Sequence, residues 1–452
     1  MDVITMHKPV IAKLKSILEQ RPISLHVPGH KNNTIGNLQQ LDVSMDMTEI
    51  TGLDDLHHPE GIMQETMENL SKHKDYDAFL LVNGTTSGIM SVIQGFASLS
   101  GSYIIARNAH KSVFHGLELA NGDATLLPMQ LSKQTRQYIG PDLARVDWYA
   151  RQHKLAILTY PNYYGECFDI ASAIQQFKDH NIPILIDEAH GAHFGLPSFP
   201  QSTMTMGADY VVQSYHKTLP ALTMSSVLYI HKNAPMQAAV RKYLSYFQTS
   251  SPSYLMMSSL ELAHEFYETY DNKEFRHKRE QIIAALHTQG FDVIESDDPL
   301  KLVIQAPGYN GYEIQQLFEN EAIYVELADE LQALLILPLW HENDSYPFDN
   351  LVARIRKMQL QQKATYQQSI NSVDSEQGYY KAMSINKTKL LNIEEATGYY
   401  LAQHIVPYPP GIPIMFQGEK VTENMIELMR YWSTQKTRVE GMKDNKIEVK
   451  DE

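Results

Sequence analysis

The stretch IPILIDEAHGAH (182–193), followed by YVVQSYHKTL (210–219), decides the fold that we predict for this chain. Each part begins with an apolar run and continues into polar residues. Similar runs stand at FLLV (79–82), YIIA (103–106), ATLL (124–127), LAILTY (155–160) and SVLYI (226–230). Between them, helical periodicity falls near 86–99, 111–121, 142–153 and 171–180. Apolar strands that alternate with helices predict an α/β domain built on a mostly parallel sheet.

The remaining residues predict further parts around this domain. We expect an N-terminal segment over 1–75 with an amphipathic helix near 11–18, a large domain over 76–295 and a small α+β domain over 296–452. The small domain should contain strands at LVIQ (302–305), AIYVEL (322–327) and ALLILPL (333–339), a helix over 347–362, a polar linker over 363–390 and a last ordered piece over 391–430. The charged end MKDNKIEVKDE (442–452) is expected to fray.

Composition narrows the class of protein. The chain of 452 residues carries 38 basic and 53 acidic residues, a net charge of −15, which disfavours nucleic acid and anionic membranes as partners. The single cysteine, Cys167, excludes an intrachain disulfide and fits a reducing compartment. No signal-peptide core opens the sequence, and no apolar run approaches the roughly 20 residues that span a bilayer. We therefore expect a cytoplasmic protein.

Polar side chains that can take part in chemistry stand where two of these strands should end. Asp187 closes the run IPILID, where a carboxylate is costly unless it meets a cation such as a protonated pyridine nitrogen. A helix N-cap or a metal ligand is the plainer alternative. Lys217 follows YVVQ with Ser214 and His216, and a lysine there can form an imine with an aldehyde, although a surface lysine is about equally expected. DEAH (187–190) resembles a helicase box, but no G-x-x-x-x-G-K-[ST] loop exists, which excludes that class.

Two further loops add to this set. FLLV runs into Gly84-Thr85-Thr86-Ser87, where backbone N–H groups, hydroxyls and a helix dipole would bind an anion, unless the segment is a simple turn with an N-cap. His110 follows YIIA, and an imidazole can stack on a flat heteroaromatic ring, although a plain polar loop is commoner. One ligand satisfies all of these residues. Pyridoxal 5′-phosphate (PLP) has a phosphate for Thr85, Thr86, Ser87, Ser214 and His216, a ring for His110, a ring cation for Asp187 and an aldehyde for Lys217.

The motifs around these residues resemble, in order along nearly the whole chain, those of the Orn/Lys/Arg decarboxylase family. This family belongs to the fold-type I, aspartate-aminotransferase-like PLP enzymes. The matching pieces are HVPGHK (26–31), TEITGLDDLHHPEG (48–61), NGTTSG (83–88), RNAHKS (107–112), DEAHGAH (187–193), QSYHKTL (213–219), TSSPSYLMMSSLE (249–261) and PYPPGIP (407–413) with GE (418–419). Plain aminotransferases do not carry HVPGHK or S-x-H-K in this arrangement.

The resemblance implies a fold-type I large domain with a small C-terminal domain, and PLP-dependent decarboxylation of a basic amino acid. The product would be CO₂ and an amine of polyamine biosynthesis; arginine is favoured as the substrate over lysine or ornithine. Lys217 would hold PLP as a Schiff base, Asp187 would pair with the pyridinium nitrogen, and His110 would stack on the ring with Ala189 against the other face. The resemblance also implies a homodimer or larger homo-oligomer with shared active sites, which Ser250, Ser251 and Tyr254 would reach from the partner.

Acidic residues in the matched motifs are candidates for the substrate's distal cation. These are Glu419 in the GE motif and Asp54 and Asp55 in GLDDL, each of which is about as well explained as an ordinary surface acid. His26 and His30 would line the entrance, unless they are structural loop histidines. We expect no metal site.

The sequence departs from the family's pattern in places. Tyr215 stands where a small threonine is usual, and Gln417 stands where a proline often precedes GE. The receiver-like domain of the longer members has no counterpart, which implies a short-type member. The alternatives are other PLP chemistry, such as an aminotransferase or a lyase, and a degenerate homologue without catalysis.

Overall fold

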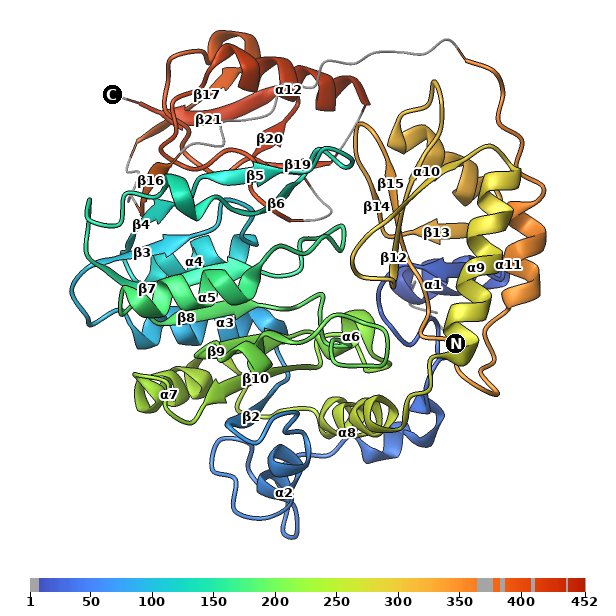
Figure 1. Cartoon of the computed structure of the whole chain (residues 1–452), viewed down its shortest axis with the longest axis horizontal. Coiled ribbons are helices and arrows are strands. Elements are labelled where there is room, and N and C mark those ends of the chain that lie inside the picture. The colour runs from blue at the N-terminus through green and yellow to red at the C-terminus, as the bar shows by residue number, and fades with distance from the viewer. Residues whose placement is uncertain (1–7, 364–376, 383–386, 408–410, 436–437, 452) are drawn as a thin grey trace, which may run out of the picture.

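A computed structural model describes residues 8–363, 377–382, 387–407, 411–435 and 438–451, and its centre is a sheet of eight strands (Figure 1). The order across the sheet is β16-β4-β3-β7-β8-β9-β10-β2. Neighbours from β4 to β9 are parallel, whereas β16, β10 and β2 pair antiparallel. The strands are β2 (Tyr76–Leu81), β3 (Ser102–Ile105), β4 (Asp123–Leu126), β7 (His153–Thr159), β8 (Ile184–Asp187), β9 (Tyr210–Gln213), β10 (Ser226–His231) and β16 (Gly378–Lys381). The predicted α/β class with a mostly parallel sheet is confirmed.

Helices cover both faces of this sheet, which explains why its strands are apolar throughout. On one face, α3 (Gly84–Gly95), α4 (Lys111–Leu119) and α7 (Gln237–Phe247) pack together. On the other face lie α5 (Ile170–Asp179) and α8 (Tyr254–Thr269). The short elements that join these parts are α2 (Ile62–Asn69), α6 (Tyr215–Thr218), the hairpin β5 (Met129–Leu131) and β6 (Tyr138–Pro141), and the 3₁₀ turns η1 (Leu38–Gln40), η2 (Val43–Met45), η3 (Leu143–Arg145) and η4 (Thr203–Met206).

The helix predicted over 142–153 is wrong. Only the 3₁₀ turn Leu143–Arg145 forms there, and β7 already begins at His153. The Asp147 carboxylate accepts a hydrogen bond from the backbone N–H of Tyr149, a local turn that competes with a helix. The Trp148 ring stacks on His180 with ring centroids 4.2 Å apart, so the segment packs onto α5 by this side chain instead.

A second unit contains an antiparallel sheet in the order β11-β12-β15-β14. Its strands and helices are α9 (Lys273–Thr288), β11 (Asp292–Glu295), β12 (Lys301–Gln305), α10 (Gly311–Asn320), β14 (Leu327–Ala328), β15 (Ala333–Ile336) and α11 (Phe348–Ile355). The N-terminal segment joins this unit, because β1 (Ile23–Leu25) pairs in parallel with β13 (Ile323–Val325). The helix predicted over 347–362 ends at Ile355; beyond it the chain turns so that Met358 is buried and Gln361 N–H bonds to the Tyr309 hydroxyl.

The C-terminal part has its own sheet and core. Strands β17 (Thr388–Asn392), β21 (Lys446–Lys450) and β20 (Met442–Lys443) pair antiparallel, together with η5 (Ile393–Glu395), α12 (Glu423–Gln435) and the pair β18 (Val406–Pro407) and β19 (Val439–Glu440). The prediction that 442–452 frays is therefore wrong. Ile447 and Val449 are fully buried, whereas Glu448 between them is half-buried and the flanking Lys446 and Lys450 are exposed, the alternation of a one-sided strand.

The predicted linker over 363–390 is only partly described. Residues 364–376 and 383–386 lie outside the described residues, and Gly378–Lys381 form the edge strand β16, with Tyr380 buried against Phe114. The domain boundaries after 75 and 295 stay predictions.

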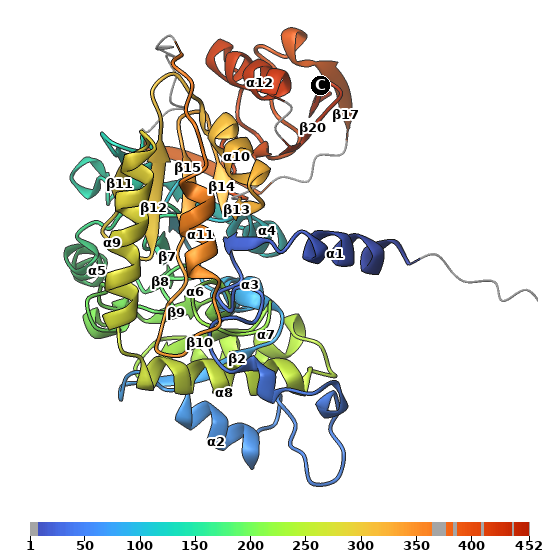
Figure 2. The same ribbon diagram turned by 90° about the vertical axis from the view of Figure 1, so that its right-hand side faces the viewer.

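Helix α1 (Pro9–Glu19) projects from the body, as Figure 2 shows, and none of its residues is buried. Its exposed apolar residues are Val10, Ile11, Leu14 and Leu18, which recur at helical spacing. Within the described residues, no helix has the length and apolar character needed to cross a membrane.

Candidate active site

Asp187 and Lys217 lie at the carboxyl edge of the large sheet, as predicted. Asp187 is the last residue of β8, is only 4% exposed, and accepts a 3.2 Å hydrogen bond from the backbone N–H of Ala189. Lys217 lies in α6, the single turn of helix that follows β9, and its Nζ is 3.0 Å from Nε2 of His190. Ligands of parallel sheets bind at this edge.

The electrostatics of this group favour a lysine that can lose its proton. Burial lowers the pKa of Lys217, opposed by the negative charges of Asp187 and Glu326. Burial raises the pKa of Asp187, opposed by the charge of Lys217. Burial and the charge of Lys217 hold the pKa of His190 well below its usual value, so its imidazole is neutral near pH 7. A neutral Lys217 amine is the nucleophile that imine formation requires.

The predicted phosphate residues come from α3 and α6. Helix α3 begins at Gly84, whose φ of +72° suits glycine, and no side chain caps its first turn. Thr85 Oγ1 lies 3.3 Å from Ser214 Oγ, so the structure brings these two hydroxyls together. Ser87 Oγ donates to the carbonyl of Gly84, and Thr86 is exposed. Their binding of phosphate stays a prediction.

Two histidines at this edge are held in neutral forms. His110 caps α4, its Nδ1 accepting from the backbone N–H of Ser112 at 3.2 Å. Burial, followed by the charges of Lys217 and Lys111, lowers the pKa of His110 to about 3. His216 Nδ1 lies 3.1 Å from the carbonyl oxygen of Ser225, and burial lowers its pKa to about 4. A neutral His110 ring is suited to stacking on a heteroaromatic cofactor.

Orphaned polar atoms test whether the site fits a cofactor. Within the described part of the chain, Asn108 Oδ1, Thr159 Oγ1, His190 Nδ1 and Thr218 Oγ1 are buried without a hydrogen-bond partner. They follow or end β3, β7 and β8, or lie in α6. Because buried polar atoms are normally paired, a polar ligand at this edge would satisfy them. Together with the buried carboxylate, the reactive amine and the α3 helix start, these residues fit PLP.

Glu326 is a residue of this site that the sequence did not reveal. It lies between β13 and β14 of the second unit, and its Oε1 accepts a 2.9 Å hydrogen bond from the Tyr163 hydroxyl. Its Oε2 accepts from the backbone N–H of Val27 at 2.8 Å. The ring centroids of Tyr163 and His190 are 4.2 Å apart. Lys217 Nζ lies 5.8 Å from the Tyr163 ring centroid. Glu326 is therefore an acid beside the Lys217 group.

The HVPGHK motif (26–31) packs directly against α6. The backbone N–H of Gly29 donates to the carbonyl of His216 at 2.7 Å, and a Cβ at Gly29 would lie 2.4 Å from the Leu219 carbonyl oxygen. Only glycine allows this approach. Lys31 is buried, donates to the carbonyls of His26 and Ile336, and has its pKa lowered by burial to about 7. Burial also lowers the pKa of His26 and of His30; their role at an entrance stays a prediction.

The acids predicted to read the substrate are engaged within the chain. Glu419 Oε1 lies 2.7 Å from Nη2 of Arg107, whose side chain is 5% exposed, and its Oε2 accepts from Phe416 N–H. Asp54 accepts hydrogen bonds from four backbone N–H groups, at residues 55, 60 and 61 of its own loop and at residue 63 in the first turn of α2. Asp55 binds His58 Nδ1 at 2.8 Å. These contacts stabilise the loops that carry the three acids.

The GLDDL and TSSPSY segments meet on an exposed face. The Tyr254 hydroxyl donates to the carbonyl of Asp54, and His57 Nε2 is 2.9 Å from the carbonyl oxygen of Thr249. Ser250 and Ser251 are exposed. Within the described residues no hydrogen bond or ion pair joins these segments to Lys217, and no cluster of His, Cys, Asp and Glu suited to a metal ion is found.

Comparisons with known proteins agree with the motifs. The family model of the Orn/Lys/Arg decarboxylase major domain matches residues 8–292, and that of the C-terminal domain matches 358–445. The uncharacterized protein YaaO of Bacillus subtilis (strain 168) is 34% identical over 466 residues, covering 96% of each chain. An arginine decarboxylase of the same organism is 27% identical over 455 residues, covering 92% of each chain.

Among solved structures, the constitutive lysine decarboxylase of E. coli superposes with a TM-score of 0.67 at 17% identity, covering 98% of this chain and 82% of that one. This likeness confirms the predicted fold-type I architecture. The major-domain model alone matches more than half of the sequence. The chain therefore belongs to the Orn/Lys/Arg decarboxylase family.

Proposed function

We propose that this protein is a PLP-dependent carboxy-lyase that converts a basic amino acid, with arginine favoured, to the corresponding amine and CO₂. The observation that carries the proposal is the contact of Lys217 Nζ with His190 Nε2 at 3.0 Å, beside the buried Asp187 and among unpaired buried polar atoms. Family membership supports the reaction class, and the Bacillus arginine decarboxylase supports arginine.

Each residue of the group has a task that follows from its environment. When bound, PLP supplies an electron sink for the electrons released as CO₂ leaves. Lys217 would hold the aldehyde, with Nε2 of neutral His190 accepting a hydrogen bond from its Nζ across 3.0 Å and so orienting the amine. Asp187 would keep the ring nitrogen protonated, because a buried carboxylate is stabilised by a cation. Neutral His110 would pack on the ring, and Thr85 with Ser214 would bind phosphate.

Glu326 is better placed than Glu419 to bind the distal cation of the substrate. Glu326 accepts a hydrogen bond from the Tyr163 hydroxyl, and the Tyr163 ring lies beside His190 and Lys217. Within the described residues, no basic side chain is hydrogen-bonded to Glu326. Glu419 already pairs with buried Arg107. We therefore assign the recognition of the ammonium or guanidinium to Glu326, a carboxylate that can bind either group.

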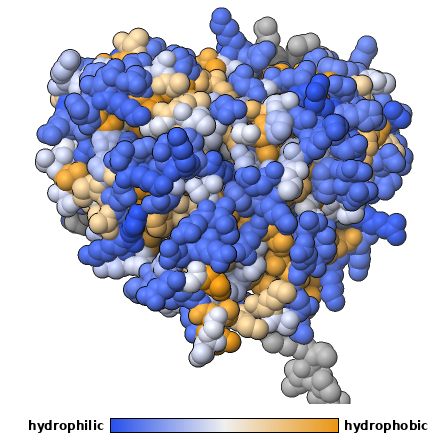
Figure 3. All heavy atoms as spheres, turned by 60° about the horizontal axis from the view of Figure 1, so that its bottom comes forward, coloured by the Kyte–Doolittle hydropathy of each residue, from blue (hydrophilic) through white to orange (hydrophobic). Residues whose placement is uncertain are grey.

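We also propose a homodimer with shared active sites. The apolar stripe of α1 has no partner in the described chain. Val43, Met45, Met47, Ile50 and Ile62 are exposed as well. Figure 3 shows hydrophobic side chains among hydrophilic ones on the face that lies at the bottom of Figure 1. Light scattering should give twice the chain mass, and Ile11→Glu with Leu14→Glu should lower it; a fully active monomer would contradict this proposal.

The test of function is spectroscopic and chemical. Purified protein with added PLP should show the visible absorbance band of a lysine-bound cofactor, and Lys217→Ala should lose it. Lys31→Met is the matched control, because it removes another buried lysine of low pKa from the same region. Wild type should then release CO₂ and amine from arginine, lysine or ornithine. Keto-acid formation instead would indicate transamination, and no band at any PLP concentration would indicate a degenerate homologue.

A further inference from the structure

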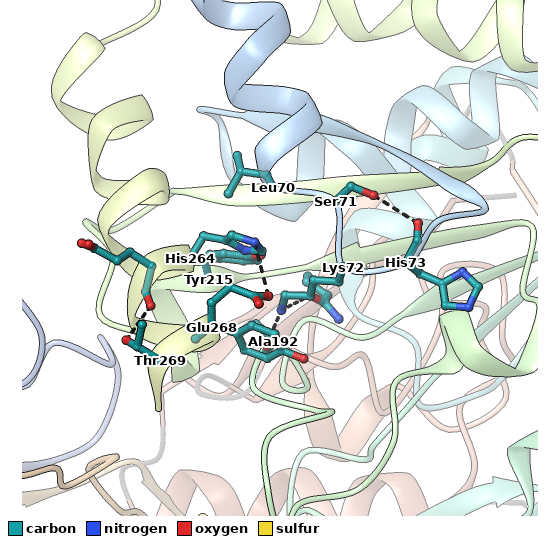
Figure 4. Close-up of polar contacts among 12 residues, drawn as sticks. Leu70, Ser71, Lys72, His73, Ala192, Tyr215, His264, Glu268 and Thr269 are labelled. Atoms are coloured by element: carbon teal, nitrogen blue, oxygen red, sulfur yellow. Dashed lines mark hydrogen bonds and ion pairs between the residues drawn. The ribbon is translucent and has the colours of Figure 1, made fainter. Parts of the chain in front are cut away.

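Lys72 bridges the two chain segments that carry Asp187 and Lys217. It lies between α2 and β2, outside the matched motifs, and its Nζ donates to the carbonyl of Ala192 at 2.5 Å and to Gln213 Oε1 at 2.9 Å (Figure 4). Ala192 belongs to the loop after β8, and Gln213 ends β9. One ammonium therefore ties the loop after Asp187 to the strand that leads into Lys217.

The same ammonium contacts Tyr215, the residue that departs from the family's pattern. Lys72 Nζ lies 4.6 Å from the ring centroid of Tyr215 and 4.0 Å from that of Tyr267. Tyr215 is fully buried, and its hydroxyl lies 2.8 Å from the Tyr229 hydroxyl and 3.1 Å from His264 Nδ1. Figure 4 shows Tyr215, His264 and Lys72 side by side. Tyr215 thus anchors α6 to α8 and β10.

A buried acid completes the connection on the Asp187 side. Gln213 Nε2 donates to Glu188 Oε1 at 2.6 Å, and Glu188 also accepts from Ser202 Oγ and from the backbone N–H and hydroxyl of Thr203. Glu188 is fully buried and directly follows Asp187. Burial lowers the pKa of Lys72 to about 7, opposed by the charges of Glu188 and Glu268. The segment that carries Asp187 and the segment that carries Lys217 are thus both connected to Lys72.

We propose that Lys72 is a positioning residue that fixes the placement of Lys217 relative to Asp187, through Ala192 on the Asp187 side and through Gln213 and Tyr215 on the Lys217 side. The inference rests on the proposed function, since the two positions matter together only when one cofactor spans them. Without Lys72, the β8 loop and α6 lose their shared support, and the reacting groups move relative to each other. Misplacement by about 1 Å can cost about a hundredfold in rate.

The test compares Lys72→Met and Lys72→Arg with Lys154→Met. Lys154 makes the same kinds of contact at the opposite end of the sheet, where its Nζ lies 4.5 Å from the Tyr103 ring centroid and donates to the Leu99 carbonyl at 3.0 Å. Readouts are kcat and KM for the best substrate, the PLP dissociation constant, and the pH at which the visible band of the bound cofactor titrates.

We expect Lys72→Met to lower kcat by about tenfold or more with KM changed less than about threefold, to weaken PLP binding and to shift the titration of the band. Lys72→Arg should recover most of kcat, and Lys154→Met should match wild type. If Lys72→Met matches Lys154→Met in every readout, the inference is wrong. Should Lys72→Met not fold, Gln213→Leu removes the same link, and unchanged kinetics there would equally overturn the inference.

Failure of this inference is distinguishable from failure of the proposed function. A wild type that neither forms the visible band nor releases amine refutes the proposed function. A wild type that does both, with a Lys72→Met variant that behaves identically, refutes only the role of Lys72.

Discussion

Replacement of Glu326 and of Glu419 by glutamine tests our proposal that Glu326 binds the distal cation of the substrate while Glu419 stabilises the fold. Glu326→Gln keeps the size of the side chain and an amide oxygen for Tyr163 or Val27, but removes the charge beside Lys217. A hydrogen bond to a charged group contributes about 1.5–3 kcal/mol. The expected loss in kcat/KM for arginine is therefore about 10- to 150-fold.

The uncharged analogue citrulline provides the matched control. It has nearly the shape of arginine but offers Glu326 no cation, so its kcat/KM should change little in Glu326→Gln. The measured quantity is the ratio of kcat/KM for arginine to that for citrulline. This ratio cancels any general loss of activity through displaced Tyr163.

Glu419→Gln should act on stability instead. Arg107 is 5% exposed and would lose its ionic partner, while the new amide oxygen can still accept from Phe416 N–H. Breaking a fully buried pair costs about 3–5 kcal/mol; because Glu419 is 24% exposed, we expect about 2 kcal/mol. Urea unfolding should show this loss with an unchanged arginine-to-citrulline ratio. If the ratio falls in Glu419→Gln and not in Glu326→Gln, our assignment is refuted and Glu419 reads the substrate.

Three further predictions concern the support of the site. Gly29→Ala places a Cβ 2.4 Å from the Leu219 carbonyl oxygen, so it should lower the free energy of unfolding in urea by about 1–3 kcal/mol and weaken the visible band. Gly61→Ala, whose Cβ would have no contact under 3.7 Å, should change both much less. His110→Ala removes the ring that we propose to stack on the cofactor, and a titration should show PLP binding weakened up to about tenfold. His264 has its pKa lowered by burial to about 4, so the unfolded chain binds a proton more readily, and stability is lost as pH falls from about 6.5 through 4. His264→Gln should remove on the order of 2 kcal/mol of this pH dependence in urea unfolding, and identical pH profiles would contradict the cause.

The parallel strands and the pair Asp187 and Lys217 were predictable because their signals are local. Each strand is apolar along most of its length, as burial on both faces requires. Asp187 ends its own run, and Lys217 stands four residues after Gln213, which ends the next one. The carboxyl ends of adjacent parallel strands meet, so the proximity of the two residues followed from topology alone.

Glu326 was not predictable because its signal is not local. It follows the short strand β13, and nothing in YVEL distinguishes it from an ordinary acid at a strand end. Its place beside Lys217 depends on how the second unit packs on the large sheet and on contact with Val27, which is 299 residues away in the sequence. The pairing of Glu419 was not predictable for the same reason, since its partner Arg107 is 312 residues away.

Tyr215 departs from the family's pattern, and its neighbours in the structure show the effect of this departure. A bulky residue two positions before the lysine would count against catalysis if its ring entered the cofactor site. Instead the ring lies against Lys72, and its hydroxyl reaches Tyr229 and His264. These partners come from three separate parts of the chain, and their contacts agree with one position of α6. A buried phenol with matched partners rigidifies its helix, because an unpaired hydroxyl there would be costly. The substitution therefore argues for a fixed Lys217 and against a degenerate homologue.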